Sequence, residues 1–241
     1  MSRIRIGTAG WSIPRQVAPS FPAVGSALQR YASRFTVAEI NSSFHRPHRP
    51  STWDRWRDSV PPDFRFSVKL PKQITHKLKL VDCGEELNLF LSQAEVLGDK
   101  LAVLLVQLPP KLEFAASVAD DFFARLADRS AARIACEPRH PSWFTKGADE
   151  LLRRHCAARV AADPAIVPAA AIPCGSAELA YWRLHGSPIK YRSSYEDRLA
   201  SHADHLKRAA AAGAEVWCIF DNTASSAALG DALSLVAGLA E

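Results

Sequence analysis

The 241-residue sequence has no run of about 18 apolar residues, the length that a membrane-spanning helix needs. It also lacks the apolar core of a secretion signal and the look of a transit peptide, because the first residues, MSRIRIGTAGW, begin a strand pattern directly. These absences predict a cytoplasmic protein with no membrane partner.

Cysteine is scarce as well. The five cysteines are odd in number and scattered, and no two have Cys-x-x-Cys spacing. We therefore expect neither a disulfide framework nor a cysteine-based zinc site, and a reduced compartment fits the pattern. Cys136 and Cys218 lie in apolar strand-like runs, where a thiol behaves as a small hydrophobic side chain.

Two kinds of cofactor motif are missing. The segment GTAGW at 7–11 follows the first apolar run but lacks the GxGxxG spacing of a dinucleotide-binding turn. Paired-histidine motifs such as His-x-His and HExxH are absent too. The first absence argues against an open, doubly wound sheet and the second against a histidine-based metal site. No cofactor is predicted.

Positive charge is concentrated in the first third of the chain. Residues 1–80 contain 14 Lys and Arg against 4 Asp and Glu, whereas the remainder contains 16 against 21. A concentrated basic segment favours an anionic partner, such as phosphate, a carboxylate or nucleic acid. Solvation of helices by the arginines is the alternative explanation.

Short apolar runs alternate with longer amphipathic ones along the whole chain. Strands are expected at residues 4–8, 37–40, 64–70, 102–107, 133–137, 159–163, 181–185 and 216–221. Helices are expected at 26–34, 51–59, 84–97, 115–127, 142–157, 196–212 and 225–239, with Ser26 and Ser51 as caps. Eight such repeats predict an α/β fold, a TIM-type (β/α)8 barrel forming a single domain over residues 1–241.

Polar residues mark the carboxyl end of every expected strand. In a barrel these ends surround the active site, so the pattern predicts a polar pocket there. In chain order the residues are Gly7, Thr8, Gly10 and Trp11; Glu39 and Asn41; Lys69; Gln107; Glu137, Arg139 and His140; Asp163; Arg183 and His185; and Asp221 and Asn222.

At these residues the chain resembles the YecE-like family, domain of unknown function 72. The matching segments are GTAGW at 7–11, LQRYASRFTVAEINSSFHRP at 28–47, FRFSVKLPKQITHKL at 64–78, QLPP at 107–110, EPRHPSWF at 137–144, RLHG at 183–186 and FDN at 220–222. The resemblance implies a TIM-type barrel and no established activity. His45 and Asp221 depart from it, since the family usually has tyrosine and asparagine there, and LGDKLAVLLVQ replaces the usual Gly-Pro turn.

Two carboxylates suggest acid and base chemistry. We expect Glu39 and Glu137 to face each other across the mouth, one with a pKa raised by burial and the other held ionised by a cation. Lys69, Arg139 and Arg183 are the available cations. The predicted catalytic residues are Glu39, Glu137, Lys69 and His185. A buried ion-pair network that merely closes the barrel is the alternative.

Other residues are expected to bind the ligand, which we predict to be a small anion such as a phosphorylated sugar or nucleotide. His76 lies in a loop beside lysines, which suits a neutral base. Aromatic side chains in the same loops suit stacking. The ligand-binding set is Trp11, Asn41, His76, Gln107, Arg139, His140, Trp143, Arg183, Tyr191, Tyr195 and Asn222.

Three alternatives remain open from the sequence. Glu137, Asp163, His185 and Asp221 form a possible divalent-metal set from strands five to eight. The basic loops at 45–79, with Arg46, Arg49, Lys72 and Lys77, suit a nucleic-acid-binding or nuclease-like protein. A barrel kept only for protein interaction is the third.

Overall fold

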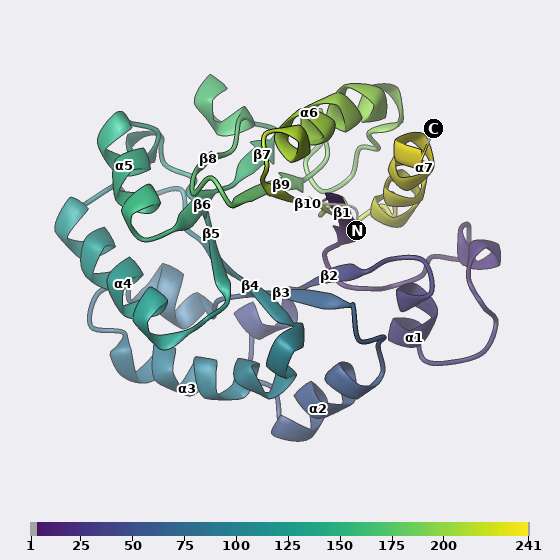
Figure 1. Cartoon of the computed structure of the whole chain (residues 1–241), viewed down its shortest axis with the longest axis horizontal. Coiled ribbons are helices and arrows are strands. Elements are labelled where there is room, and N and C mark those ends of the chain that lie inside the picture. The colour runs from purple at the N-terminus through teal and green to yellow at the C-terminus, as the bar shows by residue number, and fades with distance from the viewer. Residues whose placement is uncertain (1–3, 241) are drawn as a thin grey trace.

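Strands and helices alternate along the chain in the computed structural model, which describes residues 4–240 (Figure 1). The strands are β1 Ile4–Thr8, β2 Val37–Ile40, β3 Arg65–Lys69, β4 Leu101–Gln107, β5 Arg133–Glu137, β6 Ala157–Arg159, β7 Ala161–Asp163, β8 Cys174–Gly175, β9 Leu179–Leu184 and β10 Glu215–Phe220. The α-helices are α1 Ala27–Ala32, α2 Pro50–Asp58, α3 Gly84–Ala94, α4 Ala116–Arg129, α5 Lys146–Arg154, α6 Leu199–Ala211 and α7 Ala228–Ala240.

Short helical turns connect these elements: η1 Ala18–Ser20, η2 Ser42–Phe44, η3 Gln73–Lys77, η4 Glu95–Lys100, η5 Pro141–Trp143, η6 Pro168–Ala171 and η7 Glu196–Arg198. Several helix starts differ from expectation: the expected helix at 196–212 is divided into η7 and α6, and α7 begins at Ala228 rather than 225. Ser51 lies inside α2 rather than capping it, because the helix already begins at Pro50. The expected helix at 142–157 is divided into η5 and α5, and Thr145 caps α5 by accepting a hydrogen bond from the Ala148 N–H.

The strands form two sheets rather than the single closed sheet that the sequence pattern predicts. One has the order β1-β10-β9-β7 and the other the order β2-β3-β4-β5-β6-β8. All pairings are parallel except that of β6 with β8. The fold is therefore mixed α/β with parallel sheets.

The expected sixth strand is interrupted at Val160, and this separates the sheets. Its first half, β6, pairs with β5, and its second half, β7, pairs with β9. The short β8 occupies the free edge of β6 in antiparallel register, so β9 does not pair there. Gly175 of β8 has φ +79°, and a Cβ would lie 2.3 Å from the Ala157 carbonyl oxygen, which restricts this position to glycine.

At the other junction, β1 lies beside β2 with only one bridge between Ala9 and Glu39. The Gly10 N–H donates to the Glu39 carbonyl at 2.8 Å. A Cβ on Gly7 would lie 2.4 Å from the Val37 carbonyl oxygen, so the close approach of the two strands depends on glycine at this position.

Side chains on the strands alternate between two apolar layers. On β4, Val103 and Leu105 belong to an inner cluster, whereas Leu104 and Val106 pack with the helices. Figure 1 shows the helices on the outside of the strands. The inner cluster consists of Val37, Val103, Leu105, Ala135, Ala158, Val160, Leu179, Tyr181, Trp217 and Ile219. The strands are thus buried on both faces, as their continuous apolar runs predict.

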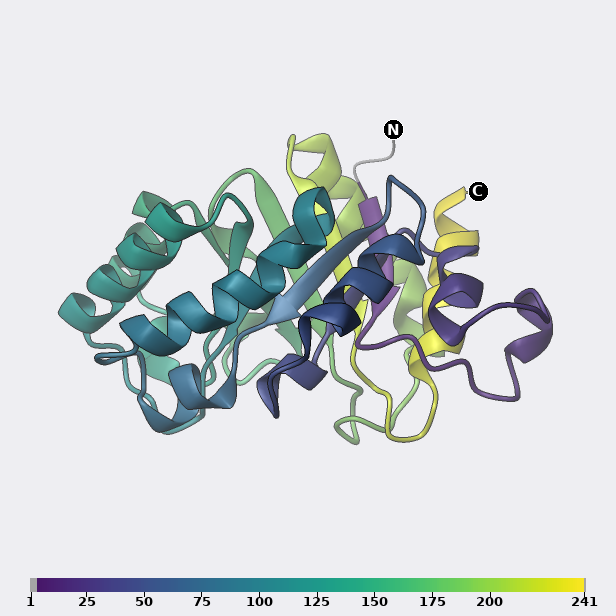
Figure 2. The same ribbon diagram turned by 90° about the horizontal axis from the view of Figure 1, so that it is seen from below.

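The parallel strands bring their carboxyl ends to one side of the molecule. In Figure 2 the arrow of β3 points toward the lower side, where the loops after β9 and β10 also lie. Within residues 4–240, no helix combines the length and apolar character that a bilayer crossing requires.

Candidate functional site

The two-residue alternation of β9 places three polar side chains on its inner face. Leu179 and Tyr181 belong to the inner cluster, and Arg183 and His185 continue the same alternation toward the carboxyl end. Ala180, Trp182 and Leu184 face the helices. Arg183 is 0% exposed and His185 is 1% exposed. A strand that is apolar at its start therefore ends in charged groups inside the fold.

Arg183 is the centre of a buried ion-pair network. Its guanidinium holds both oxygens of Glu39, with Nη2–Oε1 at 2.6 Å and Nε–Oε2 at 3.0 Å. The same side chain donates to Glu137 Oε2 at 2.6 Å and to Asp221 Oδ2 at 3.0 Å. Carboxylates from β2, β5 and the end of β10 thus converge on one cation from β9.

His185 and Arg139 complete this network on the side of Glu137. The His185 ring contacts Glu137 Oε1 through Nε2 at 2.8 Å and Asp221 Oδ2 through Nδ1 at 2.9 Å. Both partners are carboxylate oxygens, so a ring nitrogen that carries a proton donates to one of them. Arg139 donates to Glu137 Oε1 at 3.0 Å and to the Tyr191 hydroxyl at 3.3 Å.

Tyr181 and Ser67 belong to the same network, although our sequence reasoning missed them. The Tyr181 hydroxyl lies 2.9 Å from both Glu39 Oε2 and Ser67 Oγ. The signal was present, because Tyr181 precedes Arg183 by two residues and Ser67 precedes Lys69 by two. Burial and the neighbouring Glu39 raise the pKa of Tyr181 well above its ordinary value, so its hydroxyl stays protonated.

The network lowers the pKa of two of its carboxyl groups, those of Glu137 and Asp221. Burial acts to raise the pKa of Glu137, but Arg183, Arg139 and His185 outweigh it, and the pKa lies well below its usual range. The pKa of Asp221 is lowered too, because Arg183 and His185 outweigh its burial. Of the two glutamates, Glu137 is therefore the one held ionised by cations, and a role as proton donor near neutral pH is not supported for it.

Lys69 is the cation at this end of the strands that the network does not use. It is 9% exposed, and its ammonium forms no hydrogen bond or ion pair with any residue in 4–240. The Nζ atom lies 4.1 Å from the centroid of the Phe44 ring, a cation–π contact. Burial, followed by the charge of Arg183, lowers the Lys69 pKa from 10.5 to about 8.

His76 and Tyr191 lie at the edge of the same region. The ring of His76 contacts Phe44 edge-on at 4.9 Å, and its Nδ1 lies 2.9 Å from Thr75 Oγ1. Burial and then the charges of Lys69, Lys72 and Arg139 lower its pKa to about 4, which agrees with a neutral side chain. Tyr191 packs against the His185 ring at 5.6 Å.

Several predicted ligand-binding residues instead stabilise the loops. Trp143 is 1% exposed and donates from Nε1 to the Leu112 carbonyl at 3.0 Å. The Tyr195 hydroxyl accepts from the Gly186 N–H at 2.8 Å and also contacts Asp163. His140 caps η5 by accepting from the Ser142 N–H. Aromatic and polar types occur in such loops for packing as readily as for binding, and the sequence does not separate the two.

The strand pattern does not predict the contacts that Asn222 and Trp11 make. Asn222 donates to Asp231 Oδ2 of α7 and to the Ser193 carbonyl. Trp11 packs edge-on against Trp56 and Phe66.

Asn41 lies just beyond the strand that carries Glu39, and its buried Oδ1 has no hydrogen-bond partner among the described residues. β2 ends at Ile40, and Asn41 has helical backbone angles (φ −95°, ψ −17°), so the alternation that places Glu39 stops before it. Gln107 remains on its strand, in register with Glu137, and donates to the Leu108 carbonyl.

The four residues of the possible metal set do not converge. Glu137, His185 and Asp221 contact one another, but the Asp163 carboxylate binds Tyr195 and Arg198. Within residues 4–240, no group of three or more His, Cys, Asp and Glu side chains has an arrangement that holds a metal ion. All five cysteines are free thiols, and burial raises the pKa of Cys136 and Cys218.

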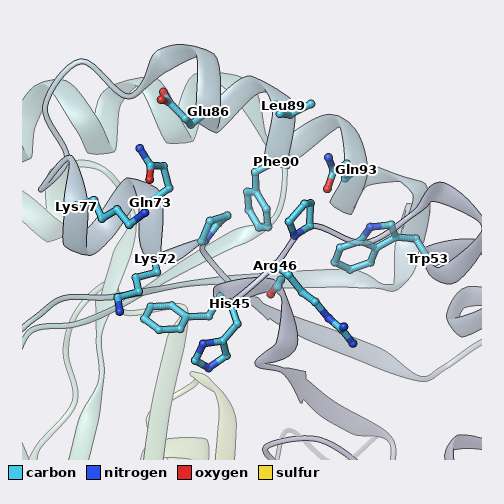
Figure 3. A pocket seen from close by; sticks show the side chains of 14 residues that line it. His45, Arg46, Trp53, Lys72, Gln73, Lys77, Glu86, Leu89, Phe90 and Gln93 are labelled. Atoms are coloured by element: carbon cyan, nitrogen blue, oxygen red, sulfur yellow. The ribbon is translucent and has the colours of Figure 1, made fainter.

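A groove of about 340 Å³ is lined in part by Phe44, the residue whose ring Lys69 contacts. Figure 3 shows the groove and ten of its lining residues by name. Figure 3 shows Phe90 projecting from α3 toward the loop with His45 and Arg46. Trp53 contributes a buried Nε1–H that has no hydrogen-bond partner among the described residues. The groove residues are Ser43, Phe44, His45, Arg46, Pro47, Trp53, Pro71, Lys72, Gln73, Lys77, Glu86, Leu89, Phe90 and Gln93.

Comparison with solved structures identifies proteins of the same architecture. A DUF72 family protein from Enterococcus faecalis V583 aligns with a TM-score of 0.82 at 19% identity, covering 99% of this chain and 96% of that one. A DUF72 family protein from Thermotoga maritima MSB8 aligns with a TM-score of 0.81 at 23% identity, covering 99% of both chains. At these identities the likeness concerns the fold alone.

Comparison with curated sequences gives relatives of the same kind. The UPF0759 protein YecE of Escherichia coli K12 is 30% identical over 156 residues, which cover 61% of this chain and 52% of that protein. The UPF0759 protein YunF of Bacillus subtilis 168 is 28% identical over 150 residues, covering 59% and 52%. The chain thus spans about half the length of the curated relatives it matches. The family described as "Protein of unknown function DUF72" matches residues 5–241, and the chain belongs to this family.

Proposed function

We propose that the protein is an enzyme that binds a small anionic ligand, such as a phosphorylated sugar, at the carboxyl ends of its strands and transfers protons there. The observation that carries this proposal is Lys69. Its amine is nearly buried and has no hydrogen-bond partner within residues 4–240. Glu137, Glu39 and Asp221 attract this cation without a direct contact, and burial outweighs them in lowering its pKa. A desolvated amine without a direct partner is costly to maintain, so a binding role gives it a purpose that stability does not.

An anion is the ligand that this region suits best. Arg183, Arg139 and His185 already neutralise the carboxylates of the network. Lys69 therefore remains free to bind a phosphate or carboxylate group. Neutral His76 and the exposed hydroxyl-bearing ring of Tyr191 lie nearby to orient the ligand.

The proton-transfer roles differ from a simple pair of glutamates. Lys69, with a pKa of about 8, is the group that exchanges protons near neutral pH. Glu39 and Glu137 fix Arg183 and Arg139, and His185 holds Glu137 and Asp221 in place. The positive field of this assembly stabilises charge that develops on the ligand.

We also infer that the two sheets work as one TIM-type barrel with this mouth. The support is two neighbour orders, β2 to β6 and β7 through β9 and β10 to β1, which the chain connects at Val160, with the bridge between Ala9 and Glu39 at the other junction. In such barrels the carboxyl ends of the strands carry the chemistry.

Ligand-dependent thermal unfolding tests the anion site. Inorganic phosphate and ribose 5-phosphate should each raise the unfolding midpoint of the wild type. At a ligand concentration of a hundred times Kd, the free energy of unfolding should increase by about 2.7 kcal/mol. Lys69→Met should reduce this ligand-induced shift, whereas Lys146→Met, at an exposed lysine of α5, should preserve it. For any substrate found, Lys69→Met should lower kcat by roughly 10²- to 10⁴-fold. Equal shifts in Lys69→Met and wild type would contradict the proposal.

A second candidate function is binding of single-stranded nucleic acid in the groove. Arg46, Lys72 and Lys77 lie on its rim, and Phe44, Trp53 and Phe90 supply aromatic surface. Basic residues beside aromatic rings suit a phosphate backbone with stacked bases. Glu86 is the one carboxylate among the groove residues.

Fluorescence anisotropy with a labelled oligothymidylate tests this alternative. Affinity should fall steeply as salt rises, and Arg46→Ala, Lys72→Ala and Lys77→Ala should each reduce the salt slope by about 1. Lys146→Ala is the control with an unchanged slope. Absent or salt-independent binding would exclude this function.

A further inference from the structure

Glu39 and Glu137 accept hydrogen bonds from other residues of the network, and the Lys69 Nζ atom at the same strand ends has no hydrogen-bond partner among residues 4–240. Every oxygen of Glu39 and Glu137 accepts at least one hydrogen bond from Arg183, Arg139, His185 or Tyr181. The Lys69 amine is therefore not held by the acids that surround it. Phe44, in van der Waals range of Nζ, keeps one side of the amine dry.

We propose that Lys69 is a covalent nucleophile, which forms an imine with the ligand, so that the substrate is an anionic aldehyde or ketone. This inference rests on the proposed anion site and adds the class of the substrate. The geometry distinguishes Lys69 from the exposed Lys72 and Lys77, which lie on the neighbouring groove. A lysine desolvated next to other cations is the usual environment of an imine-forming amine.

The protonation state of Lys69 supports this chemistry. With a pKa of about 8, about a fifth of the amine is neutral at pH 7.4, against less than about a thousandth at the ordinary value of 10.4. Only the neutral amine has the lone pair that attacks a carbonyl carbon. The remaining ammonium fraction attracts the anionic ligand to the site.

The covalent step balances without any other reactant. The Nζ lone pair forms the N–C bond to the carbonyl carbon, and the carbonyl oxygen takes up a proton, giving a carbinolamine. Nitrogen loses both of its protons in the course of the reaction, one for each proton that oxygen gains, and the protonated hydroxyl leaves as water to give the imine. Hydrolysis by one water molecule reverses the sequence and frees Lys69.

His76 is placed to move the protons of this step. When the Thr75 hydroxyl donates to the Pro71 carbonyl at 3.3 Å, Nδ1 of His76 is the donor in its 2.9 Å contact with Thr75. The proton-free lone pair then lies on Nε2, for which no partner exists among residues 4–240. His76 and Lys69 both contact the Phe44 ring, which places the base beside the nucleophile.

Borohydride trapping tests the inference on the full chain. The wild type is incubated with dihydroxyacetone phosphate at pH 7.5 and reduced with sodium borohydride, and the modified lysines are located by peptide mass spectrometry. The expected modification has the mass of the ligand minus one water plus two hydrogens. We expect the labelled fraction of Lys69 to be at least tenfold that of exposed Lys146. Lys69→Arg should lose this labelling and retain phosphate-induced stabilisation, because arginine keeps the charge but forms no imine.

The outcomes separate the imine from the anion site. If both phosphate and dihydroxyacetone phosphate stabilise the wild type but Lys69 is labelled no more than Lys146, the imine is excluded and the anion site stands. If neither ligand stabilises the protein nor labels Lys69, both proposals fail. Since the labelled site is read in the wild type, the result does not depend on the folding of a variant.

Discussion

The two ends of the parallel strands are both crossed by ion pairs, but these differ in burial and composition. At the amino ends, Glu215 of β10 receives Arg5 of β1 at 2.9 Å and Arg133 of β5, and it also accepts from Trp217 Nε1. The three charged side chains are 23%, 26% and 40% exposed. At the carboxyl ends, Arg183 and Glu39 are fully buried.

The two ends differ in composition, and the difference bears on whether each cluster only holds the strand ends together or also binds a ligand. The amino-end cluster pairs one carboxylate with two arginines and retains contact with water, which suffices to close a strand end. The carboxyl end gathers three carboxylates around Arg183 and adds His185 and Arg139. It also holds Lys69, whose ammonium has no hydrogen-bonded or ion-paired partner among residues 4–240. A network needed only for closure has no use for a desolvated amine, and our proposal of a site at the carboxyl end depends on this excess.

The largest effect is expected from removing the central cation of the carboxyl end. Arg183→Met leaves Glu39, Glu137 and Asp221 without their common partner, and it should lower the free energy of unfolding by about 3–5 kcal/mol at pH 7. Arg133→Met at the amino end should cost about 1 kcal/mol or less. Urea unfolding of both variants measures the difference.

The pH dependence of the Arg183→Met variant sharpens the same comparison. Without the arginine, burial raises the pKa of these carboxyl groups, so the folded state gains from protonating them and the variant recovers stability as the pH falls toward about 5. If Arg183→Met and Arg133→Met lose the same free energy of unfolding at pH 7, the buried network does not stabilise the fold more than the amino-end cluster does.

A gain in stability is expected from removing Lys69. Its folded-state pKa is about 8 against 10.5 unfolded, so below pH 8 the folded protein bears the cost of a charged, desolvated amine. Lys69→Met should therefore stabilise the protein at pH 7 by up to about 3 kcal/mol, from 1.36 kcal/mol per pKa unit. The gain should shrink between pH 8 and about 10.5, where wild-type stability rises because the unfolded state binds more protons.

Urea unfolding of wild type and Lys69→Met from pH 6.5 to 10.5 measures this gain. Lys146→Met, which removes an exposed side chain, should show no pH-dependent difference. If Lys69→Met is less stable than wild type at pH 7, the amine has a stabilising partner, and this would contradict the proposed role of Lys69 as a nucleophile.

Most of the buried network was predictable from the alternation of side chains on strands. Glu39, Lys69, Glu137, Arg183 and His185 were placed together because each ends an apolar run, and the structure brings four of them into direct contact. The family resemblance was confirmed by the match over residues 5–241. The same alternation should also have included Tyr181.

What the sequence did not predict depends on contacts between distant segments. The division into two sheets follows from β8, a two-residue strand within a proline-rich stretch that has no strand pattern. Trp143 and Tyr195 were assigned to the ligand because aromatic residues in loops look alike until their partners, Leu112 and Asp163, are known. The lowered pKa of Lys69 is likewise set by three-dimensional burial.

The smallest effect is expected at the amino ends. Burial acts to raise the pKa of Glu215, but Arg133, Trp217 and Arg5 outweigh it, so the folded pKa lies below the unfolded one. The contribution of Glu215 is thus complete above about pH 4.3 and is lost as the pH falls through the lower, folded pKa. Glu215→Gln should lower the free energy of unfolding by about 1 kcal/mol at pH 7. The difference in unfolding free energy between this variant and wild type should become smaller at acidic pH.

Phosphate binding distinguishes this variant from those at the carboxyl ends. Because Glu215 lies at the opposite ends of the strands from Lys69, Glu215→Gln should retain the full phosphate-induced rise in the unfolding midpoint. Thermal unfolding with and without phosphate measures it. A loss of the phosphate effect in Glu215→Gln would place the anion at the amino ends, or show that the inner column from Trp217 through the stacked Tyr181 to Glu39 couples the two ends.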